Sequence, residues 1–184
     1  LHGAHQAHNA AVALAAVEVF FGAAERMLDI DAVREGLAAV ESPGRMEIVR
    51  ADPTVMIDAA HNPHGAQALA AALAEEFAFD RVIGVVGVMA DKDVAGLLGA
   101  LEPVLDGVVV TRAQSPRAMP VDDLAAVARE VFTDDRVLVV PDLLDALDQA
   151  IALVDNPESP GGAGVLVTGS VVTAGQARTL LAGS

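Results

Sequence analysis

The 184-residue sequence carries 26 Asp and Glu residues against 11 Lys and Arg residues, so its formal net charge is −15. Such an acidic chain is a poor partner for nucleic acid and for anionic membrane surfaces, and we expect it to bind neither. Cysteine is absent, which excludes disulfides and thiolate sites. The sequence shows no signal peptide and no apolar run of about 18 residues, so we expect a cytoplasmic protein.

The first 42 residues predict two helices and no strand. Residues 5–21 are strongly helical, and this helix either ends at Gly22 or continues weakly to Met27. The side chains expected on one of its faces are Val12, Ala15, Ala16, Val19 and Phe20. A second helix is expected over residues 31–40, capped by Asp29 or Asp31, with Val33, Leu37 and Val40 buried. Because two short helices cannot bury enough surface to stand alone, we expect them to pack either on something outside this chain or on the domain that follows.

Ser42-Pro43-Gly44 breaks the helical pattern and predicts a domain boundary, with residues 1–42 and 43–184 as the two units. Beyond it, apolar strand-like runs alternate with helical patterns. Strands are expected at residues 46–49, 55–57, 82–88, 108–110, 137–140 and 165–167, and helices near 63–79, 94–101, 120–131, 142–154 and after 170. This alternation, with a core of Val, Leu, Ile and Ala, predicts a doubly wound, mostly parallel α/β sheet.

Two local details of this second unit can be checked directly. The helix over residues 142–154 is expected to be capped by Asp142 and to carry Leu144, Leu147, Ile151 and Val154. Residues 156–164, which contain two prolines and several glycines, are expected to form a surface loop.

Candidate ligand-binding residues cluster in the turn that follows the strand at 55–57. Asp58 stands where the strand should end, Asn62 is a good N-cap, and Pro63 suits the first position of a helix. In an open α/β sheet such a turn lies at the carboxyl edge of the strands, where ligands bind. Asp58 could therefore bind a ligand, although Asp also ends strands through turn chemistry alone. His61 is either a ligand donor or a histidine that stabilises its own turn.

The other strand-to-helix loops bring cations to the same edge. Lys92, the only lysine, lies there with Arg112 and Arg117. This grouping indicates an anionic ligand such as a phosphate or carboxylate, although charged residues also favour loops in general. Gly169-Ser170 follows an apolar strand and precedes a helix, so its N–H groups and hydroxyl could hold an oxyanion, or Ser170 could be a plain N-cap.

Some kinds of site are disfavoured. No G-x-G-x-x-G pattern follows the first strand, which argues against a dinucleotide fold. Lys92 is flanked by Asp91 and Asp93, so the sequence contains no Gly-Lys-Ser or Gly-Lys-Thr phosphate-binding loop. The histidines at positions 2, 5 and 8 have no acidic residue close by in the sequence, and we predict no metal site there.

A family resemblance covers nearly the whole chain. Asp58-Ala59-Ala60-His61-Asn62-Pro63 resembles the D-G/A-A-H-N-P signature of folylpolyglutamate synthases, which are bifunctional with dihydrofolate synthase in many bacteria and belong to the Mur ligase superfamily. Other segments match this family in the same order. They are His5-Gln6 with Asn9-Ala10-Ala11, Pro43-Gly44-Arg45-Met46-Glu47, Gly87-Val88-Met89-Ala90-Asp91-Lys92-Asp93, Ser115-Pro116-Arg117-Ala118 and Leu166-Val167-Thr168-Gly169-Ser170.

The resemblance implies a Rossmann-like C-terminal ligase domain at residues 43–184, with helices on both faces of its sheet, preceded by two helices left from a central ATPase domain. In this family ATP phosphorylates a substrate carboxylate, and the amine of glutamate attacks the acyl phosphate. The implied partners are an upstream P-loop domain of the same protein, ATP, folate or dihydropteroate, and L-glutamate, with Mg²⁺ held mainly upstream. We expect a monomeric enzyme, and no activity from this chain alone.

By the same resemblance, Arg45 would contact the ATP phosphates and Asp58 the nucleoside side. His61 and Ser170 would position the incoming glutamate. Further residues expected on this edge, without an assigned role, are Asn62, Lys92, Asp93 and Arg117. No catalytic residue or metal ligand is predicted within the chain. Two alternatives stay open: another Mur-type ligase that acts on a cell-wall precursor, and a non-catalytic α/β module that binds a small anion.

Overall fold

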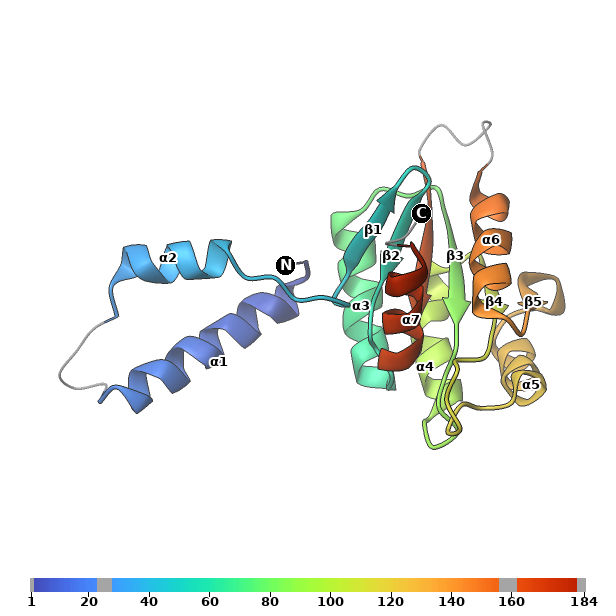
Figure 1. The fold of residues 1–184 in the computed structure, drawn as a ribbon, viewed down its shortest axis with the longest axis horizontal. Coiled ribbons are helices and arrows are strands. Elements are labelled where there is room, and N and C mark those ends of the chain that lie inside the picture. Colours follow the sequence, from blue (N-terminus) through green and yellow to red (C-terminus); the bar gives the residue numbers. More distant parts are fainter. Residues whose placement is uncertain (1, 23–27, 156–161, 182–184) are drawn as a thin grey trace.

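The computed structural model describes residues 2–22, 28–155 and 162–181, and within them the chain forms a six-stranded sheet between two layers of helices (Figure 1). The strand order is β1-β2-β6-β3-β4-β5. The strands are β1 (Glu47–Ala51), β2 (Thr54–Ile57), β3 (Arg81–Val86), β4 (Gly107–Val110), β5 (Val137–Val139) and β6 (Ala163–Thr168). All neighbouring pairs are parallel except β1 with β2, so the predicted doubly wound, mostly parallel sheet is confirmed.

Helices connect the parallel strands and cover both faces of the sheet. They are α3 (Pro63–Glu76), α4 (Val94–Leu101), α5 (Val121–Val131), α6 (Leu143–Val154) and α7 (Val171–Leu181), with short 3₁₀ turns η1 (Glu102–Val104) and η2 (Asp134–Arg136). Buried residues of α3, α4 and α5 form one core cluster with the sheet, and those of α6 and α7 form another on the opposite face. The strands are therefore buried on both sides, which explains why their sequences are almost purely apolar.

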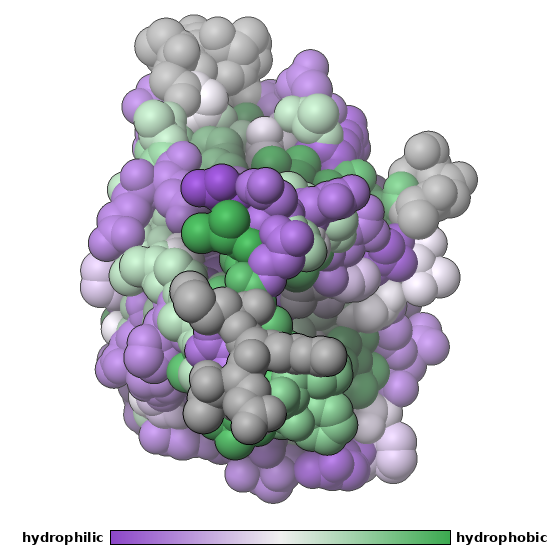
Figure 2. Space-filling view, turned by 90° about the vertical axis from the view of Figure 1, so that its left-hand side faces the viewer, coloured by the Kyte–Doolittle hydropathy of each residue, from purple (hydrophilic) through white to green (hydrophobic). Residues whose placement is uncertain are grey.

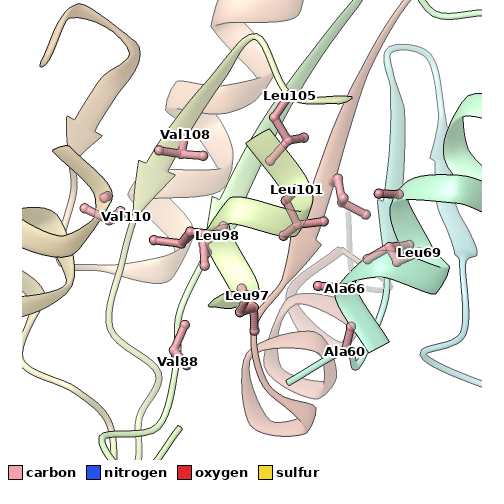
Figure 3. Packing of buried hydrophobic residues seen from close by; sticks show 14 of the residues in the cluster. Ala60, Ala66, Leu69, Val88, Leu97, Leu98, Leu101, Leu105, Val108 and Val110 are labelled. Carbon is pink, nitrogen blue, oxygen red and sulfur yellow. The ribbon is translucent and has the colours of Figure 1, made fainter. Parts of the chain in front are cut away.

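The core beneath α4 shows how the helical spacing translates into packing. All four large apolar residues of this helix are buried, namely Val94, Leu97, Leu98 and Leu101. Figure 3 shows α4 leucines between β4, which carries Val108 and Val110, and α3, which carries Ala66 and Leu69. Helix α3 ends at Glu76, before the predicted end near residue 79, and Phe77 stacks on Phe79 with their ring centroids 5.5 Å apart.

The predicted limits of β3 and of the loop before β6 were wrong. Strand β3 ends at Val86, and β6 begins at Ala163, so residues 163–164 of the expected loop belong to a strand; residues 156–161 lie outside the described part. Leu144 is 47% exposed, whereas Leu143 is buried. Asp142 caps α6 as predicted, and the buried positions then follow the three-and-four spacing from Leu143 instead of Leu144.

The two N-terminal helices, α1 (Ala4–Phe20) and α2 (Ile30–Ala38), extend away from the sheet domain (Figure 1). Neither contains a buried residue, so the predicted burial of Val33, Leu37 and Val40 is wrong within the described structure. Phe20 is 82% exposed, and apolar surface is visible on the side of the molecule where these helices lie (Figure 2). Asp29 caps α2 as predicted, and the possible extension of the first helix to Met27 lies outside the described residues.

The start of α1 contacts the end of α3. His2 Nδ1 lies 2.5 Å from a carboxylate oxygen of Glu76, and its ring packs against Phe77 with a centroid distance of 5.2 Å. The backbone N–H of Gly3 also donates to Glu76. None of the helices within the described ranges has both the length and the hydrophobicity that crossing a bilayer requires.

Candidate functional site

The carboxyl ends of the parallel strands are aligned, so the loops that follow them meet at one edge of the sheet. Ile57 is in register with Val167, and Val86 is in register with both Thr168 and Val110. Backbone hydrogen bonds continue this alignment into the loops. Asp58 donates to Val167 at 2.9 Å, Gly87 donates to Thr168 at 3.2 Å, and Gly169 donates to Ala60 at 3.1 Å. The sequence prediction that these loops share an edge is therefore confirmed.

Arg45 lies on a turn whose backbone is held on both sides. Gly44 and Met46 have positive φ values of 71° and 45°. The N–H of Gly44 donates to the Glu47 carboxylate at 2.8 Å, and the Gly44 carbonyl accepts from Ala59 at 2.8 Å. The Arg45 side chain is exposed and makes no hydrogen bond or ion pair with any residue that the structure describes. Its guanidinium is thus available to an anion, on a fixed backbone.

Asp58 is buried, with both carboxylate oxygens hydrogen-bonded to backbone. Oδ2 accepts from Met46 at 3.0 Å and Oδ1 accepts from Ala60 at 2.8 Å. Burial raises the pKa of this carboxyl above its ordinary value, and the two hydrogen bonds and the positive charge of Arg45 oppose that rise. Asp58 therefore fixes the turn that carries Arg45, and each oxygen retains a lone pair that can accept another bond.

His61 and Asn62 both stabilise the start of α3. His61 Nδ1 lies 3.0 Å from the carbonyl oxygen of Ala59, so in the tautomer with a proton on Nδ1 the ring donates to its own turn and leaves Nε2 as an acceptor. Asn62 accepts from Gly65 at 2.8 Å as the N-cap, with Pro63 at the first helical position. The predicted cap is confirmed, and the histidine has the local partner that the turn-stabilising interpretation requires.

The loops after β3 and β4 contribute the cations Lys92 and Arg117, and the carboxylate of Asp91 pairs with both. Asp91 lies 3.2 Å from Lys92 Nζ and 3.0 Å from an Arg117 nitrogen. The Lys92 ammonium, followed by the Arg117 guanidinium, lowers the pKa of Asp91. The same loops also pair through backbone, because Ala90 donates to Arg117 at 2.9 Å. Asp93 is separate from this cluster and caps α4 by accepting from Gly96 at 2.9 Å.

Ser170 is buried at the start of α7, and its hydroxyl is used within the fold. Its Oγ accepts from the backbone N–H of Thr173 at 3.0 Å and lies 2.8 Å from Thr173 Oγ1. Because the Thr173 hydroxyl donates to the Gly87 carbonyl at 2.8 Å, the Ser170 hydroxyl is the donor in the serine–threonine pair. This geometry is that of an N-cap. Gly169, with φ of 103°, brings its backbone against the loop after β3.

Arg112 takes no part in the Lys92, Asp91 and Arg117 cluster. Its backbone N–H donates to Pro141 at 3.2 Å, and it lines a cavity of about 620 Å³ between the loops after β4 and β5. No group of three or more His, Cys, Asp or Glu side chains suited to a metal ion occurs among the described residues.

The structure adds residues to this edge that the sequence did not single out as site candidates. Glu47 accepts from Gly44 and from Arg178 Nε, the latter at 2.8 Å, and so connects β1 to α7. Thr173 links Ser170 to Gly87, as described above. Arg178 lies 131 residues from Glu47, and no local pattern signals a pair over that separation. Glu47 does stand in the same short segment as Arg45, which is the one sequence signal that could have drawn attention to it.

Comparison with known proteins gives consistent results. The family described as "Mur ligase, glutamate ligase domain" matches residues 44–171. The chain is 59% identical to a Mycobacterium tuberculosis dihydrofolate synthase/folylpolyglutamate synthase over 98% of its own length and 39% of that protein. The chain thus spans about two fifths of the curated relative.

Solved structures agree with this match. A M. tuberculosis folylpolyglutamate synthase complexed with ADP superposes with a TM-score of 0.94 at 58% identity, over 98% of this chain and 41% of that one. A Yersinia pestis bifunctional folylpolyglutamate synthase/dihydrofolate synthase complexed with AMPPNP and Mn ion gives a TM-score of 0.70 at 30% identity, over 85% and 35% of the two chains.

Proposed function

Because the chain belongs to the family of the Mur ligase glutamate ligase domain, we propose that it is the C-terminal part of an ATP-dependent folate:L-glutamate ligase. The observation that carries this proposal is Arg45. It presents a guanidinium that has no hydrogen-bond or ion-pair partner among the described residues, from a fixed turn, at the sheet edge where the family signature in residues 58–63 lies. A guanidinium of this kind suits phosphate oxygens, which it can contact with two N–H groups at once.

We assign residues 1–42 to the end of a central ATPase domain and residues 43–184 to the ligase domain. The helices α1 and α2 are rich in apolar residues yet contain no buried side chain, which supports a further protein surface against them. That surface would belong to the upstream P-loop domain of the same protein, and the complete enzyme would be a cytoplasmic monomer. Since the sequence contains no P-loop, the 184 residues alone should not catalyse ligation.

On the nucleotide side, Arg45 would bind the phosphates of ATP. Asp58 would act near the nucleoside, through the lone pairs that its two backbone hydrogen bonds leave free. ATP supplies a phosphoryl group to the substrate carboxylate, which converts a poor leaving group into phosphate. The protein's part is to hold charge and position close to the reacting groups, and Arg45 can do this without moving the backbone around it.

On the amino-acid side, His61 and Ser170 would position the incoming glutamate. Its amine attacks the acyl carbon, a C–N bond forms, and the C–O bond to phosphate breaks. Glutamate brings two carboxylates, and Lys92 and Arg117 provide two cations on neighbouring loops. Asn62 and Asp93 would contribute by fixing the helix starts beside these groups.

We assign Mg²⁺ to the upstream domain. The residues that the structure describes include no cluster of three His, Cys, Asp or Glu side chains around a common point, so no step proposed for this chain passes through the metal ion.

The experiment is an assay of the complete protein with ATP, Mg²⁺, labelled glutamate, and either dihydropteroate or a reduced folate. The expected product has one added glutamate residue, formed with one phosphate released per amide. Arg45→Met should lower the rate at limiting ATP at least about tenfold, since it removes charge-assisted hydrogen bonds to phosphate. Arg129→Met, which removes a distant exposed arginine, is the matched control and should retain the activity.

The same assay addresses the two alternatives. A complete protein that ignores folates but couples glutamate or another amino acid to a cell-wall precursor would be a different Mur-type ligase. If no ligation occurs with any acceptor, and the 184-residue chain alone binds phosphate or glutamate tightly, the small-anion-binding module would replace the ligase proposal.

A further inference from the structure

We infer that Glu47 and Arg178 form a positioning pair that holds Arg45 in place for phosphate binding, a role that rests on the proposed function of Arg45. In this pair Arg178 Nε donates to both carboxylate oxygens of Glu47, at 2.8 Å to Oε1 and 3.1 Å to Oε2. Glu47 is the more buried partner, with a side-chain exposure of 25% against 51% for Arg178. Neither residue contacts the phosphates in this assignment; both act through the turn.

The first step of the argument is the backbone of the turn. Gly44 and Met46 flank Arg45, and both have positive φ. Such a conformation is unfavourable for Met, so the surroundings must hold it. Asp58 holds the Met46 side of the turn through its N–H, and Glu47 holds the Gly44 side through its N–H. Of the two carboxylates, only Asp58 belongs to the predicted site.

The second step is the fixation of Glu47 itself. A glutamate side chain has three rotatable bonds, and the hydrogen bond to Gly44 is only as well defined as the carboxylate position. Arg178 binds both oxygens of Glu47 from α7, which packs against β1 and begins directly after Ser170. The pair therefore fixes the turn of Arg45 relative to the helix that starts at Ser170, and so joins the phosphate side and the glutamate side of the site.

Amide hydrogen exchange on the 184-residue chain tests whether Glu47 holds the Gly44 side of the turn. Glu47→Ala should accelerate exchange at the Gly44 amide at least about tenfold, because its acceptor is gone, and should affect Met46 less, because Asp58 still accepts from it. Glu47→Gln retains an acceptor and should restore much of the protection at Gly44. Unchanged protection at Gly44 in Glu47→Ala would overturn the inference, whatever the function of the protein.

The test in the complete ligase is steady-state kinetics with ATP and glutamate varied separately. Glu47→Ala and Arg178→Met should raise the KM for ATP about five- to twentyfold and change the KM for glutamate less, since misplacing a charged donor weakens its bond to phosphate. Arg178→Lys should recover part of the loss. A general loss of folded enzyme would lower kcat per mole of protein and leave both KM values unchanged.

The control is Arg129→Met, which breaks an exposed ion pair of the same length, 2.8 Å to Asp134, on another helix. It should leave the KM for ATP unchanged. If Arg45→Met raises this KM while Glu47→Ala and Arg178→Met do not, the positioning role is refuted and the proposed function stands. If Arg45→Met has no effect on it, the phosphate role of Arg45 fails, and the hydrogen-exchange result still decides whether Glu47 holds the turn.

Discussion

The backbone N–H of Met46 donates a 3.0 Å hydrogen bond to the carboxylate of Asp58, which stands twelve residues later at the end of β2. The other carboxylate oxygen accepts from Ala60. One buried side chain thus joins the turn before β1 to the turn after β2. The residue that was selected as a ligand-binding candidate is also a structural element of the site.

Asp58→Ala should destabilise the sheet domain by about 2–4 kcal/mol, because it leaves the buried N–H groups of Met46 and Ala60 without acceptors. Asp58→Asn should cost less, since the amide oxygen can still accept one of the two bonds. Urea unfolding followed by circular dichroism measures both. Asp148→Ala, which changes an exposed aspartate on α6, is the control, and a cost no greater than that of this control would contradict the role of Asp58.

Gly169→Ala should destabilise the protein by about 2 kcal/mol or more. The residue has φ of 103°, and an added Cβ would lie 2.8 Å from the carbonyl oxygen of Gly87. Gly175→Ala provides a control on the adjacent helix, where an added Cβ meets nothing within 4 Å. That change should stabilise α7 by about 0.5–1 kcal/mol, because alanine favours a helix more than glycine does. Thermal unfolding of both variants tests the contrast, and shifts of the same sign would refute it.

Asn62 can be tested for a role beyond its cap. Asn62→Ala should cost about 1 kcal/mol of stability, because the N–H of Gly65 loses its acceptor. Asn62→Ser keeps a capping oxygen and should retain nearly the wild-type stability. If Asn62 acts only as a cap, Asn62→Ser will also retain ligation in the complete enzyme. A stable but inactive Asn62→Ser variant would instead show that the amide itself takes part in the site.

The carboxyl of Asp91 should titrate below its ordinary pKa of 3.8, because Lys92 and Arg117 favour its ionised form. For a lowered carboxyl pKa, the stabilising contribution is present above the ordinary value and is lost as the pH falls through the lowered one. Lys92→Met should move the pKa back toward 3.8 and further than Arg117→Met does, since Lys92 is the largest cause.

Carbon-13 NMR of the side-chain carboxyl, recorded between about pH 2 and pH 6, follows this titration. Lys92→Arg retains the positive charge and is the matched control. An Asp91 midpoint at or above 3.8 in the unmodified chain would show that the ion pairs of the structure are not formed in solution.

The sequence determined the structure of this chain where its signals act over a few residues. Asn62, Asp142 and Asp29 each stand at a helix start, and the structure shows all three as N-caps because a cap needs only the N–H groups two or three residues ahead. Periodicity also predicted the helix over residues 94–101, which is α4. It did not distinguish the buried Leu143 from the exposed Leu144 on α6, because the spacing alone does not say which neighbouring leucine faces the sheet.

Only the tertiary structure decided how distant segments meet. Strand order places β1 at the edge, antiparallel to β2, and brings α7 against it, so Arg178 reaches Glu47 across 131 residues. The same order brings Arg45, Asp58, Lys92 and Ser170 to one edge of the sheet. The apolar residues of α1 and α2, by contrast, are not covered by any part of the described chain. The physical reason is that local propensity and periodicity fix which face of an element is apolar, whereas packing between elements decides what covers it.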